Sequence, residues 1–278
     1  MDGVDVAAAL ASALLHASWN AAIKASRRPQ QAMTAQMVLS ALIVLPVLLW
    51  SGLPELAAWP WIAATTFMNV ITIAALLRAY ERAGFGVAYP VVRAVAVLLV
   101  VPLAAFVAGD RPTLGTGAGV LIIASALALL AWDAARDRGF PLSALGWALL
   151  AGLVTAGYIL CDVRGVRAAG SPWSYGAVVS LTNALAMSWR ARHDGAPWRQ
   201  VKAEWRIALP AAIASAASYL LILWVWSHAP VAPAAALRDT SALFAILIAV
   251  IFLREPFTLR RILAVLLAAA AVPLLRSG

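Results

Sequence analysis

Long blocks of apolar residues, separated by short polar turns, run along the whole chain. Four of these blocks stand out, at 32–52, 87–109, 114–132 and 231–253. Each approaches the ~20 residues that a helix needs to cross ~30 Å of hydrocarbon. A helix also satisfies its own backbone hydrogen bonds where no water is present. The pattern therefore predicts membrane-spanning helices.

Ten such helices account for the full pattern. Helix breakers separate them, such as Arg-Arg-Pro at 27–29 and Arg-Glu-Pro at 254–256. The longest polar loop is predicted at 191–205. The expected fold class is thus an all-α membrane protein. The predicted helices are 5–25, 32–52, 60–82, 86–108, 113–132, 142–163, 172–190, 206–227, 230–253 and 257–275.

Composition agrees with the bilayer as the main partner of this protein. Of its 278 residues, 64% are hydrophobic and 12% are charged, whereas a soluble domain carries ~25% charged residues. The net charge of +9 comes from short basic clusters between apolar blocks, as expected for loops at anionic headgroups, so nucleic acid is not an expected partner. Cys161 is the single cysteine, which excludes an intrachain disulfide.

Loop charge predicts the orientation. The loops after the odd-numbered helices hold fifteen Lys or Arg residues, and the opposite side holds four. Because positive loops stay in the cytoplasm, the odd-numbered loops are predicted to be cytoplasmic and both termini to lie outside, in a bacterial inner membrane. The alternative places both termini inside, and it follows if one helix is miscounted.

An internal repeat relates the two halves of the chain. A shift of 145 residues brings Arg93 onto Arg238, Asp110 onto Glu255 and Thr113 onto Thr258. The predicted repeats are 1–138 and 139–278, each with five helices, and an odd number inverts the second repeat. Inverted repeats are common in secondary transporters, with the substrate near the midplane. Chance alignment of Ala- and Leu-rich helices is the alternative, but the matched positions include charged residues.

Several short motifs resemble the drug/metabolite transporter superfamily in its ten-helix EamA-type branch. They are LHASWN at 15–20, GDRP at 109–112, LRDTS at 237–241 and FLREPF at 252–257. The resemblance covers essentially the whole chain. It implies export of a small metabolite, most closely like the exporters of amino acids, including the YddG type for aromatic ones. It is weak for the substrate.

Polar groups inside a membrane are costly, so the few that are present are candidate substrate contacts. On the first helix, His16, Trp19 and Asn20 share one face, and their alternative role is a hydrogen-bonded helix contact. Further candidates come from helices 3, 4, 6, 8 and 9. The complete set is His16, Trp19, Asn20, Asn69, Tyr80, Tyr89, Arg93, Tyr158, Ser218, Tyr219 and Arg238.

The two membrane arginines suit a zwitterionic or anionic solute, because a guanidinium stays charged and can grip a carboxylate in two places. Arg93 lies ~10 Å from the cytoplasmic end of its helix, and Arg238 lies about as deep from the outer end. The structural alternative pairs Arg238 with Asp239, Glu81 or Asp162.

The predicted function is secondary export of a small metabolite, amino acids first, by alternating access. No Walker loop is present, and no cofactor or metal is expected. We expect the protein to act as a monomer. Other metabolites or drugs, an intramembrane enzyme, and a sensor or assembly partner are the alternatives. An enzyme needs clustered catalytic groups, whereas Glu81, Asp162 and Asp239 lie on separate predicted helices.

Overall fold

The computed structural model describes residues 1–277 except residue 84 and segments 108–112, 136–140 and 254–257. All regular structure in this part of the chain is helical. Two short 3-10 turns, η1 (Leu56–Ala58) and η2 (Arg192–Asp194), join longer helices. The α-helices are α1 (Gly3–Ala25), α2 (Pro29–Ser51), α3 (Trp59–Ala83), α4 (Phe85–Val107), α5 (Leu114–Ala135), α6 (Leu142–Ala168), α7 (Pro172–Arg190), α8 (Pro197–His228), α9 (Val231–Asp239), α10 (Ser241–Leu253) and α11 (Leu259–Ser277).

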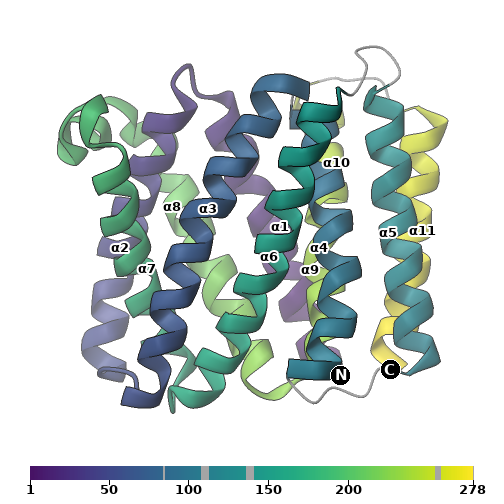
Figure 1. The fold of residues 1–278 in the computed structure, drawn as a ribbon, viewed down its shortest axis with the longest axis horizontal. Coiled ribbons are helices and arrows are strands. Elements are labelled where there is room, and N and C mark those ends of the chain that lie inside the picture. The colour runs from purple at the N-terminus through teal and green to yellow at the C-terminus, as the bar shows by residue number, and fades with distance from the viewer. Residues whose placement is uncertain (84, 108–112, 136–140, 254–257, 278) are drawn as a thin grey trace.

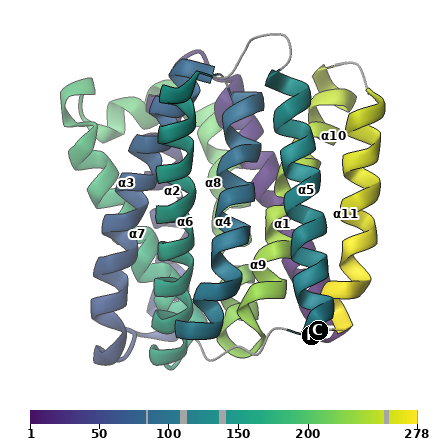
Figure 2. The same ribbon diagram turned by 45° about the vertical axis from the view of Figure 1, so that its right-hand side comes forward.

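The helices stand side by side and run between two faces of the molecule (Figure 1). Within the described residues, seven helices are long and apolar enough to cross a membrane by themselves. In Figure 2, α9 and α10 follow one another along a single path, so the chain makes ten passages. Both termini lie on the same face, which we call the terminal face. The predicted fold class, an all-α protein of ten membrane helices, is confirmed.

Two predicted helices differ clearly from the structure: one begins earlier than predicted, and one is broken in the middle. The helix predicted at 206–227 begins at Pro197, so most of the predicted loop 191–205 is η2 and the first turns of α8. Hydropathy fails here because Lys, Arg, Gln and Glu are good helix formers even where they leave the hydrocarbon. The helix predicted at 230–253 is broken at Thr240, whose hydroxyl donates to the Leu237 carbonyl at 2.6 Å and whose backbone N–H bonds that same carbonyl.

The two five-passage halves are interleaved. In the first half, α3 and α4 pack along α6 of the second half, while α1 and α2 pack along α8. At the edge of the molecule, α5 lies beside α11 (Figures 1 and 2). Because five passages end on the face opposite the start, α6 runs antiparallel to α1. The space enclosed between the halves is therefore lined by helices from both.

Small residues allow this close packing. The ring of Tyr175 on α7 lies so near Gly165 on α6 that a Cβ at Gly165 would collide with it. Gly152 of α6 likewise faces Val95 of α4. Because lipid tails are as apolar as the helix surfaces, the hydrophobic effect does not hold membrane helices together. Close van der Waals packing and hydrogen bonds do so instead. The Gly165 contact fixes the ring of Tyr175 beside Asp162, which matters for the site.

Candidate functional site

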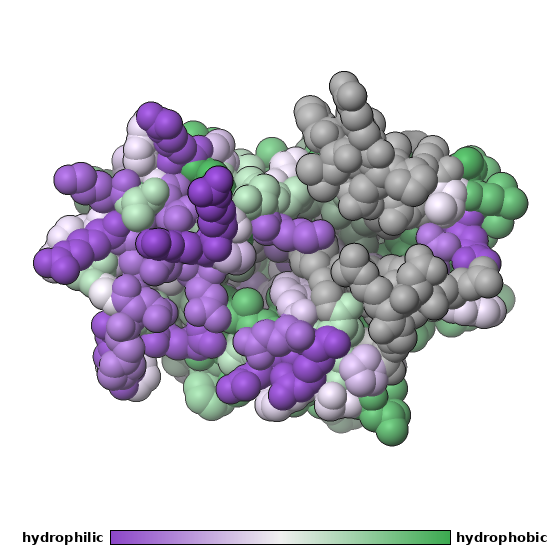
Figure 3. All heavy atoms as spheres, turned by 90° about the horizontal axis from the view of Figure 1, so that it is seen from above, coloured by the Kyte–Doolittle hydropathy of each residue, from purple (hydrophilic) through white to green (hydrophobic). Residues whose placement is uncertain are grey.

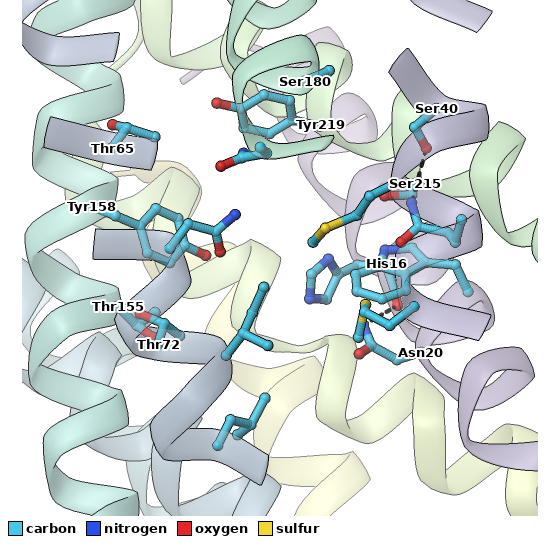
Figure 4. A pocket seen from close by; sticks show the side chains of 18 of the residues that line it. His16, Asn20, Ser40, Thr65, Thr72, Thr155, Tyr158, Ser180, Ser215 and Tyr219 are labelled. Carbon is cyan, nitrogen blue, oxygen red and sulfur yellow. Dashed lines mark hydrogen bonds between the residues drawn. The ribbon is translucent and has the colours of Figure 1, made fainter. Parts of the chain in front are cut away.

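A cavity that many polar side chains line lies between the two halves at mid-depth. Its volume is about 180 Å³. Figure 4 shows hydroxyl, amide and imidazole groups around this open space, with the rings of His16 and Tyr158 on opposite sides. Its lining is His16, Trp19, Asn20, Met33, Gln36, Met37, Ser40, Thr65, Asn69, Thr72, Ile73, Leu76, Tyr89, Val92, Arg93, Thr155, Tyr158, Asp162, Ser180, Asn183, Ser215, Ala216, Tyr219 and Arg238.

The predicted polar face of α1 points into this cavity. The rings of His16 and Trp19 meet edge to face with centroids 5.1 Å apart. The side-chain amide of Asn20 donates to the His16 carbonyl at 2.8 Å. The spacing of three and four residues places all three on one side of the helix. Here α1 presents an imidazole, an indole and an amide to any solute in the cavity.

Nine of the eleven candidates line the cavity. Besides the three on α1, these are Asn69, Tyr89, Arg93, Tyr158, Tyr219 and Arg238. The structure brings them together from six helices, α1, α3, α4, α6, α8 and α9. Whether each contacts a solute remains a prediction.

Tyr80 and Ser218 lie outside the cavity lining. Tyr80 packs in the contact of α3 with α4 and α6, near Ala79 and Ala88. The hydroxyl of Ser218 donates to the Ser12 carbonyl at 2.8 Å, and the Ser12 hydroxyl donates to the Ser218 carbonyl at 2.7 Å. This reciprocal pair fastens α1 to α8, whereas the neighbouring Tyr219 of α8 faces the cavity.

Arg93 and Asp239 form a buried ion pair across the two halves. The guanidinium of Arg93 on α4 contacts the carboxylate of Asp239 on α9, and their side chains are 4% and 1% exposed. Nearby, the hydroxyls of Tyr89 and Ser241 lie 3.3 Å apart. Of the partners considered for Arg238, Asp239 is thus taken by Arg93, and Glu81 lies in exposed pairs with Arg78 and Arg82.

Arg238 is buried without an acidic partner among the described residues. It lines the cavity and is 4% exposed. Its guanidinium carbon lies 5.5 Å from the ring centroid of Trp226, a cation–π distance. Its Nε and Nη1 atoms have no hydrogen-bond partner in the described part of the chain. Asp162 and Asp239 lie near enough to attract this charge but not within ion-pair distance, so the guanidinium can still bind an anionic group in the cavity.

Asp162 lines the cavity, although the sequence analysis considered it only as a possible partner of Arg238 and not as a candidate substrate contact. Its Oδ1 accepts hydrogen bonds from Thr65 at 2.9 Å and Tyr175 at 3.0 Å, and its Oδ2 accepts one from Tyr219 at 3.0 Å. We call these four residues the Asp162 cluster. The donors come from α3, α7 and α8. No spacing in the sequence relates them, so only the packing could reveal the cluster.

The sequence prediction also missed the contribution of α2. Gln36 donates from its side-chain nitrogen to the Ser40 hydroxyl at 2.9 Å, and Ser40 donates to the Ala212 carbonyl of α8 at 3.1 Å. An amide four residues before a hydroxyl on a membrane helix was the available signal. Within the described residues, no three His, Cys, Asp or Glu side chains gather as a metal site.

Comparison with known proteins decides the family. A model of the EamA-like transporter family matches residues 5–132 and again residues 142–277. The chain belongs to the EamA-like transporter family. It is therefore a multi-pass membrane transporter. Each match covers one of the two five-passage halves of this EamA-like transporter.

The fold also recurs among solved structures. One, titled "Crystal structure of protein", has a TM-score of 0.71 and 16% sequence identity, covering 98% of this chain and 96% of its own. At that identity the likeness extends to the fold of the EamA-like transporter alone. No curated protein matches the sequence.

Proposed function

We propose that this EamA-like transporter exports amino acids or closely related carboxylate metabolites by alternating access. The observation that carries the proposal is Arg238, a buried arginine that lines the cavity between the halves and has no carboxylate within 4.0 Å in the described chain. A solute carboxylate would offset the cost of this charge and accept two parallel hydrogen bonds from the guanidinium. The resemblance to amino-acid exporters points the same way.

The rest of the lining favours a solute with an apolar or aromatic side chain. The rings of His16, Trp19 and Tyr158 and the thioethers of Met33 and Met37 surround the cavity. Aromatic rings pack edge to face or offset, and thioethers adapt to varied shapes. Aromatic amino acids, the substrates of the YddG-type exporters that the sequence resembles, are therefore the first solutes to test.

Surface charge supports an orientation for export. Hydrophilic side chains gather on the face opposite the termini, mainly over the ends of α2, α7 and α8 (Figure 3). The positive-inside tendency favours a cytoplasmic position for this basic face in a bacterial inner membrane, with both termini outside. Exposed basic residues there include Lys24, Arg27, Arg28, Arg192, Arg199, Lys202 and Arg206.

Reconstitution into liposomes tests the proposal. Vesicles loaded with radiolabelled phenylalanine, tryptophan or threonine should lose label faster with the protein than without it. Phenylalaninamide, which lacks the carboxylate, should compete at least roughly tenfold less well, because the charge-assisted contact to Arg238 is missing. Arg260, which pairs with Asp133 at 3.0 Å on the α5–α11 edge, offers a matched control, and Arg260→Gln should retain this preference.

Three outcomes would contradict this assignment. Equal competition by phenylalanine and its amide would remove the carboxylate from recognition. Efflux of other metabolites or drugs, without amino acids, would assign the transporter to another substrate class. Chemical conversion of a solute or a lipid would favour the intramembrane enzyme.

A further inference from the structure

The Asp162 cluster closes one end of the cavity. Among the lining residues of α3 and α6, Thr65 and Asp162 lie nearest the terminal face. Tyr175 lies nearer still, as the fourth residue of α7. Beside the cluster, the hydroxyls of Thr66 on α3 and Thr182 on α7 are 2.7 Å apart. The hydrogen bonds of the Asp162 cluster form a floor between the cavity and the terminal face.

A single carboxylate holds this floor together. Asp162 on α6 is fully buried and is the common acceptor for α3, α7 and α8. Hydrogen bonds to an ionised acceptor are roughly twice as strong as neutral ones. The strength of the floor therefore depends on the charge of one group.

The charged groups around Asp162 leave it without an ion pair. In the described chain no Lys, Arg or His nitrogen lies within 4.0 Å of it. Arg93 of α4 is neutralised by Asp239, and Arg238 of α9 and His16 of α1 line the same cavity. The groups that face Asp162 from the helices packed around it are Thr65, Arg93, Tyr175, Tyr219, Arg238 and His16, with Tyr158 and Cys161 on its own helix.

We propose that Asp162 is a proton-binding site and that its protonation opens the floor of the cavity. A proton taken from hydronium in the cavity forms an O–H bond on one carboxylate oxygen and leaves water behind. The neutral carboxyl then accepts weaker bonds, and its protonated oxygen becomes a donor. The ties from α3, α7 and α8 loosen together, and the cavity gains access to the terminal face. Loss of the proton to water restores the floor.

This inference rests on the proposed function, because a floor that opens is one half of alternating access. It also adds the coupling ion: a proton exchanged at the floor links the proton gradient to solute movement. If Asp162 were purely structural, the floor would stay closed at both pH 8 and pH 5. The two roles differ in the pH dependence of the floor, which can be followed without any solute.

Spin-label distances across the floor test the proposal. Cysteines replace Leu56 before α3 and Ser171 before α7, in a Cys161→Ala background, and distances are measured in lipid nanodiscs without solute at pH 8 and pH 5. In the otherwise wild-type protein, the population with separated labels should rise roughly tenfold or more at pH 5, because three charge-assisted bonds lose about half their strength together. Asp162→Asn should show the separated population at both pH values.

Two matched variants sharpen the test. Asp133→Asn removes a carboxylate of α5 that pairs with Arg260 away from the cavity, and it should keep the wild-type pH response. Tyr175→Phe removes one of the three donors and should separate the labels at higher pH than wild type. If Asp162→Asn does not fold, the Tyr175→Phe shift decides instead.

The proposal is overturned if the wild-type distances are the same at both pH values, or if Asp162→Asn keeps the pH response. Since no solute is present, neither result affects the amino-acid assignment. Conversely, failure of every amino acid in the efflux assay would leave the pH response of the floor intact.

Discussion

Arg93 and Arg238 occupy equivalent positions in the two repeats, yet their surroundings differ. The same shift of 145 residues that aligns the halves superposes them in sequence. Arg93 is neutralised by Asp239, whereas Arg238 faces Trp226 and the cavity without an acidic partner in the described residues. The repeat therefore places two charges at mid-depth, and packing joins one of them to the other half of the protein and leaves the second facing the cavity.

The largest expected effect is a loss of stability when the Arg93–Asp239 ion pair is broken. Arg93→Gln or Asp239→Asn alone should lower the free energy of unfolding by about 3–5 kcal/mol, because each leaves a buried charge without its partner. Thermal unfolding of the purified protein measures this. The double variant Arg93→Met with Asp239→Leu should recover most of the loss. A double variant as unstable as the singles would argue against the pair as the cause.

Arg238→Gln should affect solute binding more than stability, in contrast to Arg93→Gln. Losing its charge-assisted contact should weaken the binding of a carboxylate solute by roughly 10–100-fold, which corresponds to about 1.5–3 kcal/mol. The thermal unfolding midpoint should fall far less than in Arg93→Gln, because no carboxylate within ion-pair distance loses its partner. Solute affinity and unfolding are measured on the same preparation. A large drop in stability with unchanged affinity would place Arg238 with Arg93 as a structural residue.

A smaller effect is expected on the α1 face. His16→Ala or Trp19→Ala should lower transport by roughly 2–10-fold, the range of a lost aromatic contact, while expression stays intact. Trp198→Ala, at an indole 70% exposed near the start of α8, is the matched control and should transport normally. Initial efflux rates from liposomes give the comparison. Unchanged rates in both α1 variants would remove this face from the solute path.

The smallest expected effect concerns Ser12 and Ser218. Each Ser→Ala change removes one hydrogen bond between α1 and α8 and should cost about 1 kcal/mol of stability. Solute affinity should stay the same, since neither residue lines the cavity. Unfolding and binding measurements together check this. A marked loss of affinity in Ser218→Ala would restore Ser218 to the solute site.

The apolar pattern predicted most of the fold, because a bilayer imposes one solution on each long apolar block. The prediction of 172–190 coincides with α7. The prediction failed at two places where hydropathy does not decide the structure. The polar end of α8 remains helical back to Pro197, and Thr240 separates α9 from α10. Side-chain hydrogen bonding and helix propensity, which hydropathy ignores, set those limits.

The candidate site could be predicted only in part. His16, Trp19 and Asn20 were recognisable because their spacing alone places them on one helix face, and the structure turns that face to the cavity. Gln36, Thr65 and Tyr175 were not, because they belong to helices whose neighbours are set by the interleaving of the halves. Tyr219 and Ser218 show the limit, since adjacent residues of α8 face different surroundings.

The sequence by itself determined that this is a ten-passage helical membrane protein with an internal repeat, because long apolar blocks and turn residues act locally. Only the tertiary structure decided which polar groups meet. Asp239 could pair with either arginine, and it pairs with Arg93 across α4 and α9. Asp162 gathers three hydroxyls from distant helices. The role of a charged side chain inside a bilayer depends on which group lies next to it, and tertiary packing determines that neighbour.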